Sequence, residues 1–537
     1  MRDGLLVYLM QRIGCETEGE AAEMQPTSYR RWSRRVAANG LALLSFVLFA
    51  VAVLSLHQER FVPFVLEEEG PVSTVLSHYF FGATHALVDS AIPKFFHEEV
   101  GTLPAEEAIE RALQAEIKPT HDLAPVTDGT GIGPVLMIRA AFAVFGLRAR
   151  ALPYFFVLVL GISTVAFIFR FQDRRIFVIP VLFTAFTVLI LSPLTSDAAN
   201  AAEAPFGGMR SYAIVGIIAT LHWCFEIFDG SSVGNRSWTA RWTSVSIQVT
   251  ILGFAILVRG APAYLLGPVL AVGLYRANMN WKWATLRPIL LRVAVPIAAL
   301  VVALLSITPI ISPEYARAGR AFSTVWHRLF VTFGVHPNWP FPGLREKYSC
   351  PEIPEGLTPG LLDRAGHCIW WTYAREHHLS LERVKRETYG AEYERALRSA
   401  VWYVVRTYPK ETIETFFIFK PKLVINNVLT MLNLHAPNDR SLPAVLLVLQ
   451  CAILFVFMIS WPRQTVLADI AFGARLLSLF LVFGLVPQIV AWARPPTVID
   501  YNVYAVCVVI LGFWLVLAAV IAVVVRSDIA PARSSEC

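Results

Sequence analysis

Ten apolar segments of membrane-spanning length constrain this 537-residue chain more than any other feature. They cover approximately residues 36–56, 151–169, 176–194, 210–228, 243–258, 261–276, 288–311, 441–460, 476–492 and 503–525. Groups of arginine and lysine fall in alternate connections, while the other short connections carry single arginines. Since basic residues stay on the cytoplasmic side, this alternation predicts an all-α polytopic membrane protein of about 10 transmembrane helices, with both termini cytoplasmic.

This topology places two long segments on the outer side of the membrane, over residues 57–149 and 312–440. Both are predicted to be mostly helical, with helices over 105–117, 379–407 and 410–432, the last lying on the outer leaflet with a kink at Pro421. The remaining units are a cytoplasmic tail over 1–35, a seven-span module over 36–311, three C-terminal spans over 441–525 and a second tail over 526–537.

Residues 133–146 are apolar, but we do not count them as a span. Counting them would move Arg170, Arg174 and Arg175 to the outer side and break the charge alternation. The apolar residues contribute roughly −2 to −4 kcal/mol to insertion, and Arg139 at mid-depth costs roughly 2.5 to 3.5 kcal/mol. The two contributions nearly cancel, so we predict a helix lying flat on the outer surface.

The composition excludes several classes of function. Charged residues make up 16% of the chain, against about 25% in soluble proteins, and hydrophobic residues make up 55%. The net charge of +6 comes from residues flanking the spans, so it does not indicate nucleic-acid binding. The sequence has no Walker A loop, no dinucleotide-binding fingerprint and no zinc-type Cys/His grouping. Of seven cysteines, only Cys350 and Cys368 fall on the outer side, where we predict a disulfide between them.

Three acids at the outer boundary are candidate catalytic residues. Asp89 lies in the apolar sequence 87–91, a setting that favours a raised carboxyl pKa. Asp128 lies in the glycine-rich turn 127–133, where the backbone can approach a ligand, and Asp197 lies between the third and fourth spans. The alternative for each is a capping or turn acid, because aspartate is common in turns for purely local reasons.

Two arginines and two histidines are candidate substrate-binding residues. Arg210 and Arg259 each stand alone at a tight turn, at the depth of a lipid phosphate, which a guanidinium fork fits. The alternative is an arginine that snorkels to the interface. His327 and His336 are flanked by tryptophans, a mixture that binds sugars but also forms the aromatic belts of membrane proteins.

The layout over residues 30–311 resembles the GT-C superfamily of membrane glycosyltransferases, which includes the protein O-mannosyltransferases and the lipid A aminoarabinose transferases. The stretch from Gly133 to Arg148 is similar to the flat helix of that family, which ends in Phe-Gly. The sequence 192–197 places Asp197 where the family has its second-loop acid. The chain departs from the family at Glu67-Glu68-Glu69, where many members have an Asp-Glu or Asp-x-Asp pair.

The resemblance implies a hexosyltransferase that moves a sugar from a polyprenyl-phosphate donor to a lipid, glycan or protein acceptor on the outer face of the membrane. The loops favour a bacterial inner membrane, although the endoplasmic reticulum would obey the same charge rule. It implies that a first-loop carboxylate deprotonates the acceptor hydroxyl, with Asp128, Asp89 and the Glu67 cluster as the choices. Arginines or a divalent metal ion would stabilise the leaving lipid phosphate, and Asp197 would orient the acceptor or help to hold a metal. No residue is assigned as a metal ligand.

Two other interpretations stay open at this point. A transporter or flippase of a lipid-linked intermediate would need a polar path through the full membrane thickness. A scaffold without catalysis would leave Asp89, Asp128 and Asp197 far apart and solvated.

Overall fold

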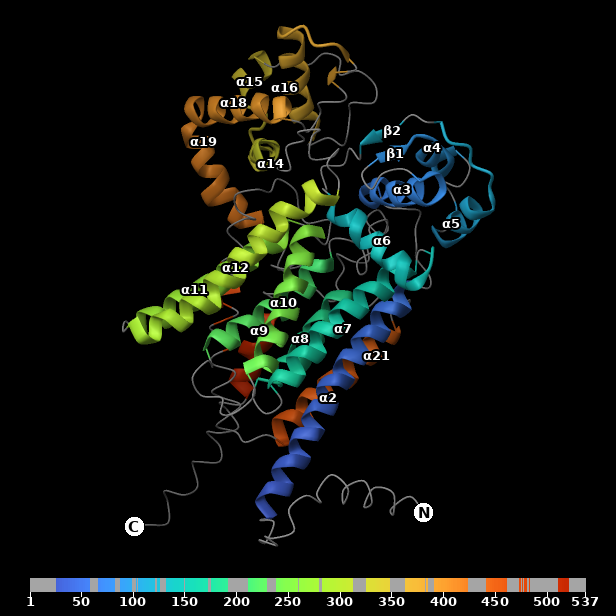
Figure 1. Ribbon diagram of the computed structural model, residues 1–537. Coiled ribbons are helices and arrows are strands. Elements are labelled where there is room, and N and C mark those ends of the chain that lie inside the picture. The colour runs from blue at the N-terminus through green and yellow to red at the C-terminus, as the bar shows by residue number, and fades with distance from the viewer. Residues whose placement is uncertain are drawn as a thin grey trace.

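The computed structural model shows a helical bundle with two lobes at one end (Figure 1). It describes residues 26–57, 66–82, 87–98, 103, 105–120, 123–125, 132–148, 150–171, 175–191, 211–228, 238–258, 260–279, 283–311, 325–347, 363–381, 383–384, 391–423, 441–460, 473–474, 476, 478–480, 482 and 510–520. We call the end that carries the lobes the lobe end and the other the opposite end.

The bundle confirms that the chain is a multi-pass membrane protein. Its helices are α2 (Pro26–His57), α7 (Ala151–Phe171), α8 (Val178–Ile190), α9 (Tyr212–Phe228), α10 (Trp238–Val258), α11 (Leu266–Met279), α12 (Trp283–Ile311), α21 (Ser441–Ser460) and a helix over 510–520. A short 3-10 helix, η3 (Ala261–Leu265), joins α10 to α11. Three segments, in α2, α7 and α10, are long and apolar enough to cross a membrane, and several shorter apolar helices accompany them. Of the predicted span over 476–492, only a few positions fall within the described residues.

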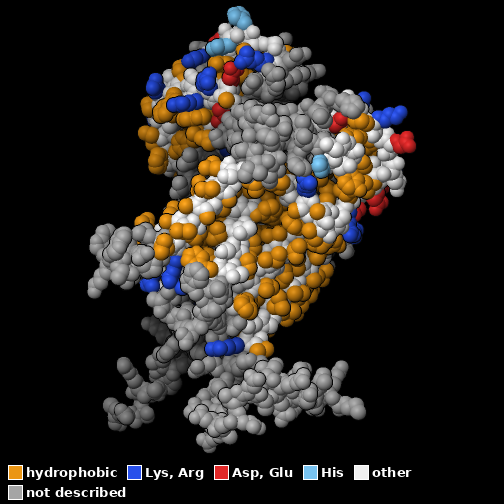
Figure 2. All heavy atoms as spheres, in the orientation of Figure 1, with side chains coloured by type: hydrophobic (Ala, Val, Ile, Leu, Met, Phe, Trp, Pro, Cys, Tyr) orange, Lys and Arg blue, Asp and Glu red, His pale blue; other side chains and the backbone are white. Residues whose placement is uncertain are grey.

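Hydrophobic side chains cover the visible face of the bundle, and charged side chains gather on the lobes and toward the opposite end (Figure 2). Exposed Val165, Phe169, Leu274 and Leu305 illustrate this surface, being 53 to 72% accessible to solvent. An apolar surface of this extent on a helical bundle fits the hydrocarbon core of a bilayer.

The first lobe is built on the bundle itself. It contains α3 (Leu66–Phe81), α4 (Ala91–Glu98), α5 (Ala105–Gln114) and α6 (Gly133–Phe145), and α5 confirms the helix predicted near 105–117. Strands β1 (Leu87–Asp89) and β2 (Leu123–Pro125) add a two-stranded antiparallel sheet that the sequence analysis did not predict. Buried side chains of this lobe, such as Leu76 and Ile109, belong to the same hydrophobic core as the bundle.

Helix α6 crosses the lobe end of the bundle rather than running along it (Figure 1). That it lies flat on the membrane surface stays a prediction. It packs on α7, α3 and α10 and buries one face, including Met137, Ile138 and Phe142. A Cβ atom at Gly133 would lie only 1.8 Å from the carbonyl oxygen of Leu257, so the start of α6 touches the backbone of α10 directly. Only glycine permits that approach.

The second lobe has a hydrophobic core of its own. It contains α14 (Val325–Thr332), η4 (Phe333–Val335), α15 (Pro342–Lys347), α16 (Asp363–Glu376), α18 (Ala391–Thr407), α19 (Pro409–Glu414) and the π-helix η5 (Thr415–Phe419). Its core gathers residues such as Phe330, Trp370 and Leu397, and none of the described core residues is shared with the bundle. Helix α18 ends before Pro409, as predicted. Cys368 is disulfide-bonded, while Cys350 lies outside the described residues.

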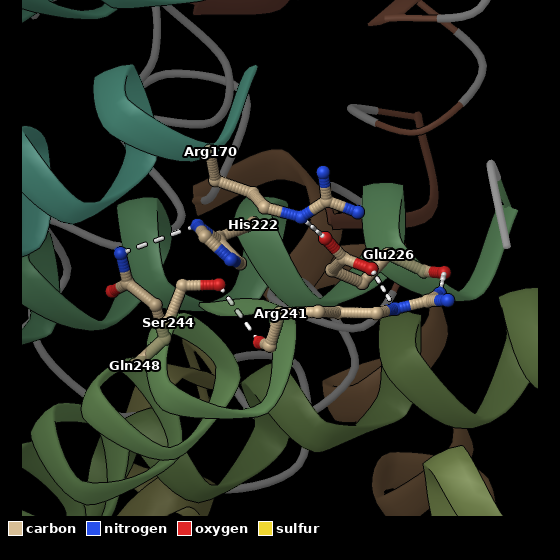
Figure 3. Close-up of polar contacts among 6 residues, drawn as sticks. All are labelled: Arg170, His222, Glu226, Arg241, Ser244 and Gln248. Carbon is tan, nitrogen blue, oxygen red and sulfur yellow. Dashed lines mark hydrogen bonds and ion pairs between the residues drawn. The ribbon is translucent and has the colours of Figure 1, made fainter. Parts of the chain in front are cut away.

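Three helices of the bundle are tied together by one buried carboxylate near the opposite end (Figure 3). Glu226 of α9 is 3% exposed and accepts hydrogen bonds or ion pairs from Arg170 of α7 and from Arg241 of α10, whose Nε lies 2.7 Å from Glu226 Oε2. An Nη2 atom of Arg241 also donates to the Glu226 carbonyl oxygen at 3.1 Å. Removing one partner from a buried ion pair leaves an uncompensated charge, which is strongly destabilising.

We therefore predict that Glu226→Gln lowers the thermal midpoint of the detergent-solubilised protein, with a loss on the order of 3 to 5 kcal/mol. Thermal unfolding followed by intrinsic tryptophan fluorescence measures it. Glu107→Gln is the control, because Glu107 is 48% exposed and pairs with Arg111 on the surface of α5. Equal midpoints for the two variants would contradict the structural role of Glu226.

Candidate functional site

The lobe end of the bundle carries the first lobe, which includes α6, and the base of the second lobe (Figure 1). Of the seven residues predicted from the sequence, Asp89, His327 and His336 are described. Asp128, Asp197, Arg210 and Arg259 lie outside the described residues. Glu67, Glu68 and Glu69 lie in the first turn of α3.

Asp89 fastens three parts of the first lobe to one another. Its side chain is buried, and Oδ1 accepts hydrogen bonds from the backbone N–H of Ala91 at 2.9 Å and from Thr120 through its hydroxyl at 2.6 Å and its N–H at 3.2 Å. Its own N–H donates to Ser77 Oγ of α3. The bond to Ala91 caps the start of α4. An oxygen that already accepts three hydrogen bonds is poorly placed to take a proton from a substrate, so the geometry favours the capping interpretation for Asp89.

His327 lies inside the second lobe, held by residues of α18. The ring Nδ1 of His327 lies 2.6 Å from the hydroxyl oxygen of Tyr393, and the backbone N–H of His327 donates a hydrogen bond to Glu394 Oε1. Glu394 Oε2 also accepts the N–H of Trp326, so this carboxylate caps the N-terminus of α14 from a neighbouring helix. Burial raises the pKa of Glu394 even though both N–H donors favour its charged form. These contacts hold the lobe together, which is a structural use of His327.

His336 joins the turn after η4 to the helix at the base of the lobe. Its Nδ1 accepts the N–H of Asn338 at 3.1 Å, so the ring proton is on Nε2, which faces Glu414 Oε2 at 3.3 Å. The ring packs edge-on against Phe419, with centroids 4.9 Å apart. His336 thereby fixes the position of the segment formed by α19 and η5.

The segment of α19 and η5, which continues to residue 423, has the two faces expected of a helix at a membrane surface. Ile413, Phe417 and Ile418 point outward and are 55 to 77% exposed. On the other face, Phe416 contacts Phe333 of the second lobe. The π-helix over Thr415–Phe419 precedes Pro421, which cannot donate a hydrogen bond to the preceding turn. The position of this helix on the outer leaflet stays a prediction.

Lys420, on the buried face of this segment, is the most unusual charged residue at the lobe end. It is 0% exposed, and its Nζ atom has no hydrogen-bond partner among the residues that the structure describes. Burial lowers the pKa of Lys420 from 10.5 to about 6. Burying an amine without a hydrogen-bond partner costs free energy, so a buried amine of this kind indicates a functional role. Such an amine can take a proton or bind an anion that enters beside it.

Sequence reasoning placed Lys420 on the surface helix but did not single it out. The available signal was the position of this lysine between Phe419 and Pro421, at the end of an aromatic run. When an aromatic helix face packs on a lobe, the next residue along the helix can also be buried. Glu414 and Tyr393 gave no such signal, because their partners lie 66 to 78 residues away. Among the described residues, no three His, Cys, Asp or Glu side chains gather to hold a metal ion, and a divalent metal remains a prediction.

Comparisons with known proteins give one distant structural likeness. No protein-family model matches the chain, and no curated protein matches it by sequence. The crystal structure of ArnT from Cupriavidus metallidurans bound to undecaprenyl phosphate is similar, with 14% identity and a TM-score of 0.30. The match covers 90% of this chain and 71% of that chain. A likeness at that TM-score carries no functional argument.

Lys420→Met is predicted to raise the thermal midpoint, because it replaces a buried, unpaired amine with an apolar side chain of similar length. The folded protein holds Lys420 neutral above about pH 6, whereas the unfolded chain keeps it protonated up to about pH 10.5, so unfolding takes up a proton between these values. The burial penalty is therefore largest at and below pH 6 and fades as the pH rises toward 10.5. Each pKa unit corresponds to about 1.4 kcal/mol.

Thermal midpoints of Lys420→Met and the unmodified protein, measured from pH 5.5 to 9.5, test this. Their difference should shrink as the pH rises. Lys422→Met is the matched control, since Lys422 is exposed two residues further along the same helix. A difference that is absent, or that grows with pH, would show that Lys420 is not held as a buried amine.

Proposed function

We propose that this protein is a membrane glycosyltransferase that moves a sugar from a polyprenyl-phosphate donor to an acceptor at the lobe end of the bundle. The single observation that carries the proposal is the buried amine of Lys420, on the inner face of a helix whose outer face is apolar and exposed. A polyprenyl phosphate presents its charged group at this depth, between an apolar chain and a polar headgroup layer. The membrane in question is the bacterial inner membrane, with the lobe end facing the periplasm.

The position of both lobes supports this proposal. They lie at the same end of the bundle, with α6 across its surface, so polar residues of both can face one lipid headgroup (Figure 1). The first-loop helix ending in Phe-Gly and the seven-span layout are the features that resemble the GT-C glycosyltransferases. Those transferases use lipid-phosphate sugars as donors, which matches an anion site at the membrane boundary.

The proposed reaction is a direct displacement at the anomeric carbon. The acceptor hydroxyl oxygen forms a new bond to that carbon, while the bond from the carbon to the phosphate oxygen of the donor breaks. The proton of the hydroxyl passes to a carboxylate, and the bonding electrons leave with the lipid phosphate. Lys420, protonated when the anion enters, would stabilise the charge on the departing phosphate.

For the general base we favour Asp128 over Asp89. Asp89 Oδ1 already accepts three hydrogen bonds within the first lobe. Asp128 has the glycine-rich sequence context that suits a close approach to a ligand. Asp197, Arg210 and Arg259 keep their proposed roles in orienting the acceptor and binding phosphate. A divalent metal ion, if used, would assist the leaving phosphate.

A transporter or flippase of a lipid-linked intermediate is the second candidate, and one observation favours it. Within the bundle, Ser163 Oγ donates to Gln248 Oε1 at 2.7 Å, and Gln248 Nε2 lies 3.4 Å from His222 Nδ1. A buried polar chain between spans is what a transport path requires. Figure 3 shows Gln248 and His222 of this polar group beside the ion pairs of Glu226.

The test is transfer of labelled sugar from a polyprenyl-phosphate donor by the full-length protein in liposomes, with a bacterial envelope extract as acceptor. We expect time-dependent transfer and release of polyprenyl phosphate. Lys420→Met should reduce the initial rate by roughly 100-fold, the loss seen when one transition-state donor is removed. Lys422→Met should leave the rate within about twofold. No transfer from any polyprenyl-phosphate sugar, together with movement of the intact donor between leaflets, would favour the transporter.

A further inference from the structure

The second lobe carries two neighbouring tryptophans at its surface. Trp402 of α18 is 46% exposed, and its ring centroid lies 6.4 Å from that of the partly buried Trp326 of α14. Val325, which precedes Trp326 in the chain, is 49% exposed. Large apolar side chains that are exposed next to one another, unlike single ones, mark an interaction surface.

Arg398 is the third member of this group. Its guanidinium carbon lies 5.5 Å from the centroid of the Trp326 ring, and Arg398 precedes Trp402 by one turn of α18. A guanidinium group that stacks on a ring through its face keeps the N–H groups of its edge for an acceptor. Trp326, Trp402 and Arg398 therefore combine an aromatic surface with hydrogen-bond donors.

A buried carboxylate fixes the position of this group. Glu394, one turn before Arg398 on α18, accepts the backbone N–H of Trp326 at 2.8 Å and that of His327 at 3.2 Å. Glu394 is 6% exposed, so its carboxylate points at the start of α14 and not at the surface. Helix α18 therefore holds both the backbone of Trp326 and the guanidinium group that stacks on its ring. A surface fixed before a ligand arrives costs little free energy to order on binding.

Positive charge extends this surface along α18. Four exposed side chains follow one another at intervals of three or four residues, which places them on one face of the helix. They are Arg395, Arg398, Trp402 and Arg406, and we call the three arginines the arginine stripe. The stripe covers about 16 Å of the helix axis. Figure 2 shows lysine and arginine side chains gathered on this lobe.

The two acids of α18 do not neutralise the arginine stripe. Glu392 pairs with Arg383, 3.0 Å away, and Glu394 is engaged at the start of α14. In the part of the chain that the structure describes, no arginine of the stripe forms an ion pair. This face of α18 is therefore complementary in charge to an anionic ligand.

The position of α18 distinguishes this surface from an aromatic belt at a membrane. Aromatic belts lie at the ends of the spans. Helix α18 lies farther from the bundle than α14, which packs against it, and α19 and η5 lead from the end of α18 toward the bundle (Figure 1). Trp402 and the arginine stripe therefore lie on the part of the second lobe that is remote from the spans.

We propose that this face of the second lobe binds an anionic saccharide. A sugar ring lies against Trp326 and Trp402, because the C–H face of a sugar is apolar and packs on an indole ring. The carboxylate or phosphate groups of the saccharide pair with the arginine stripe, since a guanidinium fork donates two parallel hydrogen bonds to either group. The stripe is longer than one sugar ring, so it fits a chain of sugars. As the site that holds a glycan acceptor it rests on the proposed function, whereas saccharide binding itself needs no catalysis.

The test is isothermal titration calorimetry of the purified full-length protein in detergent, without a donor lipid. Tri-galacturonate supplies carboxylates, maltotriose phosphate supplies a phosphate, and maltotriose is the neutral probe. At least one anionic trisaccharide should bind saturably and roughly tenfold more tightly than maltotriose. Trp402→Ala and Arg398→Gln should each weaken that binding about fivefold, the loss of one aromatic contact or one exposed charge pair. Added sodium chloride should weaken it as well, because salt screens exposed charges.

The matched control is Arg375→Gln, because Arg375 is an exposed arginine on α16 of the same lobe. This variant should keep the affinity within about twofold. Equal affinity for all three trisaccharides, or equal losses in Arg375→Gln and Arg398→Gln, would overturn the inference. So would binding to phosphatidylglycerol vesicles that Trp402→Ala abolishes, without saccharide binding, because the surface would then contact a membrane. Sugar transfer without saccharide binding would overturn this inference alone, and saccharide binding without transfer would count against the proposed function alone.

Discussion

The free-energy cost of moving charge out of water organises this molecule. It sorts the basic residues to one end of the bundle, and that sorting fixes which way each span runs. Helices α7, α9 and α11 start at the lobe end. Arg170, Glu226 and Arg276 are near the C-terminal ends of these helices, so they lie at the opposite end of the bundle. Where charge had to be buried it is paired, as in the contacts of Glu226 with Arg170 and Arg241. Within the described part of the chain Lys420 has no hydrogen-bond partner, which is why it is the group we associate with a ligand.

The two lobes are stabilised in different ways. The first lobe places its apolar side chains on the bundle and shares one core with it. The second lobe packs aromatic residues into a separate core and carries a helix with an exposed apolar face. A site between the lobes would have the first lobe, which shares its core with the bundle, on one side. The second lobe, which has its own core, would be on the other side.

The sequence predicted the features that depend on local composition. Apolar length and basic flanks located the spans, while the flat position predicted for α6 from Arg139 within a 14-residue stretch stays a prediction. Features that depend on distant partners were not accessible. The partner of Asp89, Thr120, is 31 residues away, and each three-residue strand is too short to give an alternating pattern. Glu226 was overlooked although a lone acid inside a predicted span is itself a signal. The burial of Lys420 follows from how the helix docks on its lobe, which no local pattern records.

The contact between Gly133 and Leu257 has a consequence for how the proposed lipid donor would enter. Two backbones that touch leave no side chain able to change rotamer between them, so α6, the first lobe and α10 are expected to move as one rigid piece. The second lobe, with no core residue in common with that piece among the described positions, is free of this restriction. Admission of a long prenyl chain would then be a swinging motion of the second lobe over a stationary platform.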